Sequence, residues 1–238
     1  MNNKVNPSDR LIFALDFTDR NKAETFVNEL DGLVNFFKVG IILHTSAGPD
    51  FVQWLLKKGK KVFLDLKFFD IKATVRDAVK QVSDMGVDFL TVHANREVML
   101  GAVEGKGANP LKILAVTLLT NLGALDPLET RVGLKTEELV LHRAKMAAET
   151  GCDGVITSGK EIRAIKEKEG NKLLVVTPGV RPAGALQDEH QRITTPFDAI
   201  EAGADYLVVG RPIKNASEPR LVATKIISEI EAGLHKRV

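Results

Sequence analysis

The chain has 238 residues, of which 44% are hydrophobic and 27% are charged, and its formal net charge is +2. This composition is ordinary for a soluble globular protein, and the length allows one large domain or two small ones. No apolar run approaches the roughly 20 residues that span a bilayer, and no basic stripe indicates a nucleic-acid binder. The N-terminus is polar and Cys152 is the only cysteine. We therefore expect a cytoplasmic protein without disulfides that binds neither membranes nor nucleic acid.

Short apolar runs alternate with amphipathic stretches along the whole chain. The predicted strands are 11–17, 36–41, 61–67, 89–94, 112–119, 154–158, 173–180 and 206–213. The predicted helices are 21–30, 49–58, 72–85, 95–104, 136–149, 161–169, 196–202 and 217–232. Several helices end in a glycine-bearing turn, as in DMGVD, ETGCD and EAGAD, which is typical of a helix stop before a strand.

Eight strand–helix units of this length predict an α/β protein with a (β/α)₈ TIM barrel. The strands are rich in Val, Ile, Leu and Phe without strict alternation, as expected where both faces of a sheet are covered. The alternative is a doubly wound open sheet, but its glycine-rich first turn is missing from LDFTDRNKAE. No linker divides the chain, so we expect residues 1–238 to form a single barrel domain in which 1–10 is a polar N-terminal extension.

Polar residues stand where the predicted strands end, which is where the active sites of such barrels lie. They are Asp16, Lys38, Asp65, Lys67, Asp70, His93, Thr120, Arg181 and Arg211. The stretch KVFLDLKFFDI holds three of them, and Asp65 and Lys67, two apart, point the same way on a strand. For a single charge, a salt bridge at a strand end is as good an interpretation as a catalytic role, and Asp70 could be a helix N-cap. The full set favours chemistry, because buried charges are costly.

The ends of the last two strands predict a phosphate site. TPGVR (177–181) and VVGRPI (208–213) bring glycines, which let backbone N–H groups approach an anion, and an arginine that can clamp it. Many barrels bind phosphate after strands seven and eight. The sequence therefore predicts a phosphate ester as substrate.

These residues resemble the orotidine 5′-phosphate decarboxylase family over almost the whole chain. The resemblance rests on ALDF (14–17), FKVG (37–40), FLDLKFFDI (63–71), TVHA (91–94), VTLLT (116–120), TPGVR (177–181), QRI (191–193) and VVGRPI (208–213). It implies a barrel enzyme that decarboxylates orotidine 5′-phosphate to uridine 5′-phosphate in pyrimidine synthesis, without a metal or cofactor. It also implies a homodimer with shared active sites.

The resemblance assigns roles residue by residue. Lys38, Asp65 and Lys67 would come from one subunit and Asp70 from its partner, and Lys67 would protonate C6 of the pyrimidine. The implied substrate contacts are Asp16, Lys38 and the partner's Thr74 to the ribose, Thr120 to the pyrimidine, and Arg181, Gln191, Gly210 and Arg211 to the phosphate. The chain departs from the family pattern at Lys72-Ala73, where Pro-Asn is common, and at Asn95-Arg96-Glu97, where a Ser/Gly-rich turn is common.

Two alternatives remain at this stage. Related barrels, the hexulose-phosphate synthases and ketogulonate-phosphate decarboxylases, are Mg²⁺-dependent sugar-phosphate lyases and share the Asp-x-Lys-x-x-Asp element. They resemble this chain less at Lys38, where they have a glutamate. The other alternative is a non-catalytic protein that binds a phosphate ligand. We assign no catalytic role to Cys152 or to a histidine, since His93 is expected to be structural and no metal-ligand spacing occurs.

Overall fold

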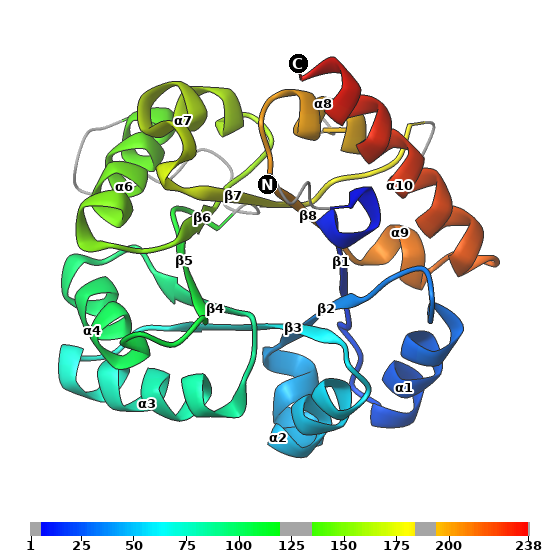
Figure 1. Cartoon of the computed structure of the whole chain (residues 1–238), viewed down its shortest axis with the longest axis horizontal. Helices are drawn as coiled ribbons and strands as arrows, with labels where there is room; N and C mark the ends of the chain where they lie inside the picture. The colour runs from blue at the N-terminus through cyan, green and yellow to red at the C-terminus, as the bar shows by residue number, and fades with distance from the viewer. Residues whose placement is uncertain (1–5, 120–134, 184–193, 238) are drawn as a thin grey trace.

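The computed structural model describes residues 6–119, 135–183 and 194–237. Its eight strands are parallel and close into a barrel in chain order, and helices surround the barrel (Figure 1). Because β1 pairs with both β2 and β8, the sheet has no edge. The predicted (β/α)₈ barrel is confirmed, and the open doubly wound sheet is wrong.

The elements follow one another as predicted, with three additional helical segments, α9, η1 and η2. The strands are β1 Leu11–Ala14, β2 Phe36–Gly40, β3 Lys61–Phe68, β4 Phe89–His93, β5 Lys112–Val116, β6 Gly154–Ile156, β7 Leu174–Pro178 and β8 Tyr206–Val209. The helices are α1 Arg20–Glu29, α2 Ile41–Lys57, α3 Lys72–Met85, α4 Arg96–Lys106, α6 Thr136–Thr150, α7 Ile162–Glu169, α8 Pro196–Glu201, α9 Arg211–Lys214 and α10 Pro219–Lys236. Two 3₁₀ turns, η1 Pro7–Arg10 and η2 Gly170–Lys172, precede β1 and β7.

Several predicted strands run past their observed ends, and β8 shows why. The prediction of 206–213 is wrong after Val209, because Arg211–Lys214 form α9. Pro212 lies in the first turn of this helix, where its missing N–H costs nothing. The apolar pattern of 206–213 does not show where the strand ends and the helix begins. Arg211, predicted near the end of the strand, is the first residue of α9.

Helix α2 begins well before the predicted 49–58. It starts at Ile41, directly after β2, and bends at Gly48, whose φ of +66° suits glycine. Pro49 then begins the straight second part. The first part escaped the prediction because the apolar residues Ile41 and Ile42 continue the strand pattern of FFKVG.

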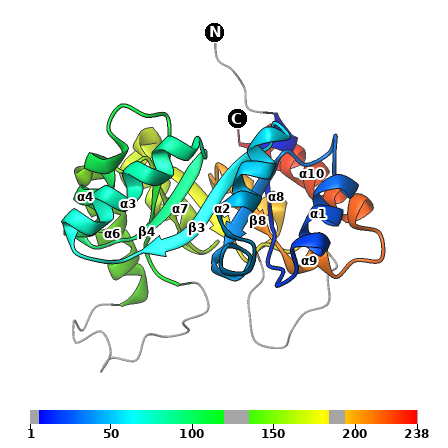
Figure 2. The same ribbon diagram turned by 90° about the horizontal axis from the view of Figure 1, so that it is seen from below.

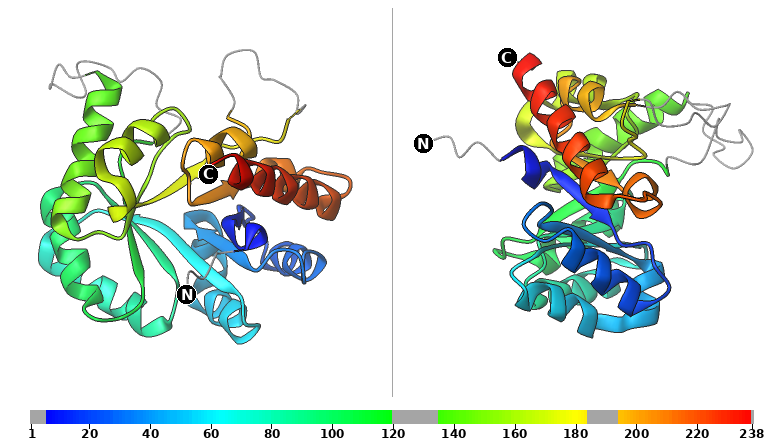
Figure 3. Two further views of the ribbon diagram at one scale, coloured as in Figure 1. Left: turned by 45° about the horizontal axis from the view of Figure 1, so that its top comes forward. Right: turned by 90° about the vertical axis from the view of Figure 1, so that its right-hand side faces the viewer.

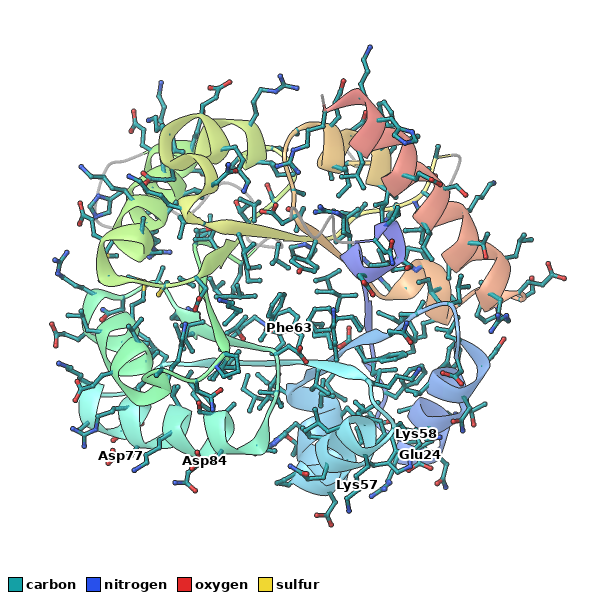
Figure 4. All side chains as sticks on the ribbon, in the orientation of Figure 1. Glu24, Lys57, Lys58, Phe63, Asp77 and Asp84 are labelled. Atoms are coloured by element: carbon teal, nitrogen blue, oxygen red, sulfur yellow. The ribbon has the colours of Figure 1, made fainter. Side chains whose placement is uncertain are left out.

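The barrel interior is apolar at its amino-terminal end. Phe36, Phe63, Phe89 and Tyr206 pack there edge to face, with ring centroids 4.9–5.9 Å apart. Phe63 points into the middle of the barrel, whereas Glu24, Lys57, Lys58, Asp77 and Asp84 project outward (Figure 4). This plug of aromatic rings closes one end of the barrel and leaves the carboxyl end for a site.

A second apolar core lies between the strands and the helices. Its members are the outward-facing strand residues and the inner faces of the helices, and α8 and α10 lie side by side over β8 (Figure 3). At the amino-terminal end of the barrel, η1 and the end of α10 lie together (Figure 2). There Arg10 donates to the Asp205 carbonyl and Arg237 to the Ala204 carbonyl. Of the helices that the structure describes, none has the length and apolarity that crossing a membrane requires.

Candidate active site

A cavity of about 350 Å³ opens at the carboxyl ends of the strands. Its polar lining comes from β1–β3 on one side and from the segments after β7 and β8 on another. The lining residues include Asp16, Lys38, Asp65, Lys67, Val116, Ile156, Arg181, Val208, Gly210 and Arg211. The cavity therefore gathers most of the site residues that the sequence predicts.

The polar side of the cavity is a chain of alternating charges. Lys67 Nζ lies 2.7 Å from Asp65 Oδ1, and Lys38 Nζ lies 3.3 Å from Asp65 Oδ2. Lys38 Nζ also donates to Asp16 Oδ1 at 3.1 Å. Lys38 and Asp65 are each only 9% exposed. The buried ammonium of Lys38 and the partly exposed ammonium of Lys67 thus each have a carboxylate partner, which offsets their desolvation.

Gly40 leaves space for this chain of charges because it has no side chain. A Cβ atom there would lie 3.0 Å from Lys38 Nζ and 3.4 Å from Asp16 Oδ1. A side chain at this position would push the amine away from the carboxylate. The glycine of FKVG is therefore needed to keep the Lys38–Asp16 ion pair together.

Asp65 is ionised although it is buried. Burial alone would raise the pKa of this carboxyl, but the charges of Lys38 and Lys67 and hydrogen bonds from Lys67 and Thr91 lower it below its ordinary value. The ionised carboxylate lies within 3.3 Å of both lysine ammonium groups. Positive and negative charges therefore alternate along this side of the cavity.

Lys67 has a strained backbone. Its φ of +50° is the one positive φ of a non-glycine residue in the described ranges. The β3–β4 register shifts between Leu64 and Phe68, so the strand bulges at this residue. Such strain persists only where surrounding structure holds it, and it often marks a functional site.

The opposite side of the barrel is apolar at the same height. Val116 of β5 and Ile156 of β6 line the cavity there, and Val208 of β8, the strand beside β1, adds to the apolar lining. Because the barrel is closed in chain order, β5 and β6 lie across its axis from β1 and β2. A planar ring placed between the two sides would have charges along one edge and an apolar wall along the other.

The segments after β7 and β8 form the cationic end of the cavity. Arg181 and Arg211 line it together with Gly179 and Gly210. The Arg181 N–H donates to the Thr194 carbonyl at 3.2 Å, which ties this loop to the segment that precedes α8. Two guanidinium groups beside glycine backbone can bind a phosphate through charge-assisted hydrogen bonds.

Two predicted site residues lie away from the cavity of their own chain. Asp70 and Thr74 are exposed and are not among the residues that line it. Asp70 Oδ1 accepts from the Ile71 N–H, and it does not cap α3, whose N-cap is Ile71. The alternative interpretation of Asp70 as the N-cap of this helix is wrong. Thr120 and Gln191 lie outside the described residues.

His93 and Cys152, which are not among the residues that line the cavity, have structural environments. Burial and the charges of Lys67 and Arg143 lower the pKa of His93, so its imidazole is neutral at neutral pH. Its ring packs edge to face on Phe69. Burial raises the pKa of the Cys152 thiol to about 12. Neither group is prepared to act as a base or a nucleophile.

Thr91 is a site residue that the sequence pattern did not single out. It is fully buried, and its hydroxyl donates to Asp65 Oδ1 at 2.9 Å. Its position two residues after Phe89 and two before His93, on one face of β4, was the available signal. That signal is weak, because threonine is common in strands.

Comparison with known proteins agrees with this geometry. The sequence model of the family described as "Orotidine 5′-phosphate decarboxylase / HUMPS family" matches residues 9–226. The chain belongs to this family.

Relatives within the orotidine 5′-phosphate decarboxylase / HUMPS family are similar over nearly their full length. The orotidine 5′-phosphate decarboxylase of Methylorubrum extorquens (strain PA1) is 46% identical over 97% of this chain and 99% of its own. That of Nitrobacter winogradskyi is 42% identical over 95% and 94%. The crystal structure of orotidine 5′-phosphate decarboxylase from Lactobacillus acidophilus superposes with a TM-score of 0.83 at 37% identity, covering 94% of this chain and 100% of that one.

Proposed function

We propose that this protein decarboxylates orotidine 5′-phosphate to uridine 5′-phosphate and CO₂. The observation that carries the proposal is that Asp65 holds two ammonium groups in a cavity at the mouth of the barrel, and that two arginines line the other end of this cavity. The family and the names of its relatives support this activity. We infer that one barrel domain, spanning the whole chain, performs it.

The proposed reaction needs an electrostatic catalyst. The C6–carboxylate bond breaks, CO₂ leaves, and the electron pair stays in the plane of the ring at C6, where no carbonyl delocalises it. An ammonium beside C6 stabilises that charge and then gives it a proton. Lys67 fits this role, because it lines the cavity and Asp65 Oδ1 holds its Nζ at 2.7 Å. The neutral amine regains its proton from solvent.

The remaining site residues fit binding roles. We assign Asp16 and Lys38 to the ribose hydroxyls, and Arg181, Gly210 and Arg211 to the phosphate. Thr120 and Gln191 keep their proposed contacts to the pyrimidine and the phosphate. The phosphate contacts lie at a distance from C6, so their binding energy can be used to orient the ring.

We also propose that the active form is a homodimer in which Asp70 and Thr74 enter the partner's site. Large apolar side chains are exposed around them: Phe69 is 67% exposed and Ile71 is 71% exposed. Ile41 and Ile42, at the start of α2, are 56% and 52% exposed. Exposed apolar residues grouped at the carboxyl ends of neighbouring strands β2 and β3 are typical of a protein–protein interface.

A Mg²⁺-dependent sugar-phosphate lyase is the second candidate, since the family also includes HUMPS proteins. The charges of the site disfavour it. Both oxygens of Asp65 have a lysine ammonium within 3.3 Å. A divalent cation at Asp65 would have to displace or neutralise both lysines. No group of three or more acidic, histidine or cysteine side chains suited to a metal occurs in residues 6–119, 135–183 and 194–237.

One assay tests the proposal. We expect the purified protein to consume orotidine 5′-phosphate in the presence of EDTA, followed by loss of the substrate's ultraviolet absorbance. The Lys67→Ala variant should show no loss. Activity that appears only with added Mg²⁺ would support the lyase instead. Binding without turnover under both conditions would indicate a phosphate-ligand binding protein.

A further inference from the structure

Thr91 occupies an unusual place for a polar side chain. It lies in the middle of β4 and is fully buried, and it is inaccessible to a ligand in the cavity. It belongs to the same face of β4 as Phe89, which is part of the barrel interior. Its hydroxyl therefore sits directly beneath the charged residues of the site.

The hydroxyl of Thr91 makes two hydrogen bonds of fixed direction. It accepts from the Lys67 N–H at 3.0 Å and donates to Asp65 Oδ1 at 2.9 Å. An N–H can only donate and an ionised carboxylate can only accept, so neither bond can reverse. The hydroxyl is thereby locked in one orientation.

These two bonds close a loop around a single lysine. Asp65 Oδ1, which accepts from Thr91, also accepts from Lys67 Nζ at 2.7 Å. Thr91 thus holds the backbone of Lys67 directly and its ammonium through one shared oxygen. The main chain of Lys67 lies at the β3–β4 register shift with φ of +50°. There the hydroxyl takes an N–H that a regular ladder would pair with a carbonyl.

The geometry points to Thr91 as a positioning residue that fixes both the backbone and the ammonium of Lys67. This inference rests on the proposed function, in which Lys67 delivers the proton to C6. Thr91 touches no reacting atom. Its contribution is the placement of the ammonium relative to the bond that breaks, and small errors in placement are costly in catalysis.

Two substitutions of Thr91 distinguish the effect of its hydroxyl from the effect of its packing. Thr91→Val keeps the volume but leaves the Lys67 N–H without its partner, and we expect kcat to fall at least about tenfold with KM within about threefold. KM should hold because the phosphate end is untouched. Thr91→Ser keeps the hydroxyl and should stay within about threefold of wild-type kcat. The acid limb of the pH profile should move to higher pH in Thr91→Val, since Asp65 loses a hydrogen bond to its charged form.

Thr117→Val is the matched control. Thr117 follows β5, is also fully buried, and donates to the Ile156 carbonyl at 2.8 Å, but it does not line the cavity. This variant should lose stability while kcat and the pH profile stay at wild-type values. A Thr91→Val enzyme with kcat within threefold of an active wild type would overturn the inference, as would equal losses in Thr91→Val and Thr91→Ser.

Crystal structures of the variants test the inference independently of activity. In Thr91→Val we expect Lys67 to leave its positive φ, or Lys67 Nζ to move away from Asp65. If wild type proved inactive on orotidine 5′-phosphate, the proposed function would fail, and these structures would still decide whether Thr91 places Lys67. An unchanged Lys67 in the Thr91→Val structure would overturn the positioning role.

Discussion

Asp65 is the residue on which the charges of the site depend. Its two oxygens face two different ammonium groups, at 2.7 Å from Lys67 and 3.3 Å from Lys38. Lys38 has a second carboxylate in Asp16, whereas the ion pair of Lys67 in the described residues of this chain is with Asp65. Loss of the Asp65 charge would leave two cations facing each other in a poorly hydrated place.

We therefore predict that Asp65→Asn destabilises the protein in a pH-dependent way. At pH 7 the free energy of unfolding should fall by about 2–3 kcal/mol, less than for a fully buried pair because Lys67 is partly exposed. The folded-state pKa of Asp65 is lowered, so its contribution is present above the unfolded value near 3.9 and is lost as pH falls through the folded value. Urea unfolding of both proteins from pH 7 down to about pH 2, through the range in which this charge is lost, measures this.

The control for this prediction is Asp84→Asn on α3. Asp84 is exposed and points away from the barrel (Figure 4). Its substitution should change stability by less than about 0.5 kcal/mol at either pH. A stability difference between wild type and Asp65→Asn that stayed constant as pH fell would contradict the assignment of the effect to the Asp65 charge.

At the scale of single residues, spacing in the sequence predicts which face of a strand a side chain lies on, but not its backbone angles or its hydrogen-bond partners. Asp65 and Lys67, two apart on a strand, lie on one face as expected and meet in the cavity. The positive φ of Lys67 and the hydroxyl of Thr91 beneath it were not predicted. Both arise from the pairing of β3 with β4, which joins residues 24 and 26 positions apart in the chain.

At the scale of elements, one local device recurs before β4, β6 and β8. Asp88, Asp153 and Asp205 each accept from a main-chain N–H of the preceding strand, at 2.8–2.9 Å. Their own N–H groups donate back to the carbonyls of those same residues. Each aspartate follows a G-x segment in the sequence, in DMGVD, ETGCD and EAGAD. The glycine-bearing turns, from which the helix ends were predicted, thus also contain an aspartate that joins neighbouring strands through two hydrogen bonds.

The three aspartates differ in their charge partners, which predicts different responses to removal of the charge. Burial raises the pKa of Asp88, so its charge weakens the fold at neutral pH and stability gains on acidification through that pKa. Asp88→Asn keeps an oxygen for the Val62 N–H and should leave the free energy of unfolding unchanged or up to about 1 kcal/mol higher at pH 7.

Asp153→Asn is the matched comparison. Asp153 pairs with Lys106 at 2.6 Å and Lys112 at 3.1 Å, and the amide would leave both ammonium groups without this partner. We expect a loss of about 1–3 kcal/mol at pH 7. Chemical denaturation of the two variants under one condition measures the contrast. Equal losses in both would mean that the backbone bond, rather than the charge, sets the cost.

The order and type of the elements were predictable, but their ends were less so. Periodicity located all eight strands, because each is an apolar run bounded by polar turns. It missed the first part of α2 and all of α9, since both directly follow a strand and start with residues that continue its pattern. Helix starts that follow a strand without a polar turn carry little local signal.

At the scale of the whole molecule, the barrel divides its interior by chemistry. Aromatic rings close the amino-terminal end, charges from β1–β3 line one side of the mouth, and apolar residues from β5 and β6 line the other. Asp70 and Thr74, which the family resemblance assigns to the site, point to solvent beside exposed Phe69 and Ile71. In the proposed dimer, one chain would present a site and, next to it, residues for the partner's site.

The proposed shared site makes a prediction about mixed dimers. Lys67→Ala and Asp70→Asn should each be nearly inactive alone. Mixed in equal amounts, they form hybrid dimers in which one site has Lys67 from one subunit and Asp70 from the other, and the second site lacks both. With random exchange, half the dimers are hybrids, so about a quarter of wild-type activity should return. Subunit exchange is followed by native mass spectrometry and activity by absorbance.

A mixture of Asp70→Asn with the double variant Lys67→Ala/Asp70→Asn is the control and should stay inactive. Hybrid dimers without recovered activity would mean that Asp70 acts within its own chain.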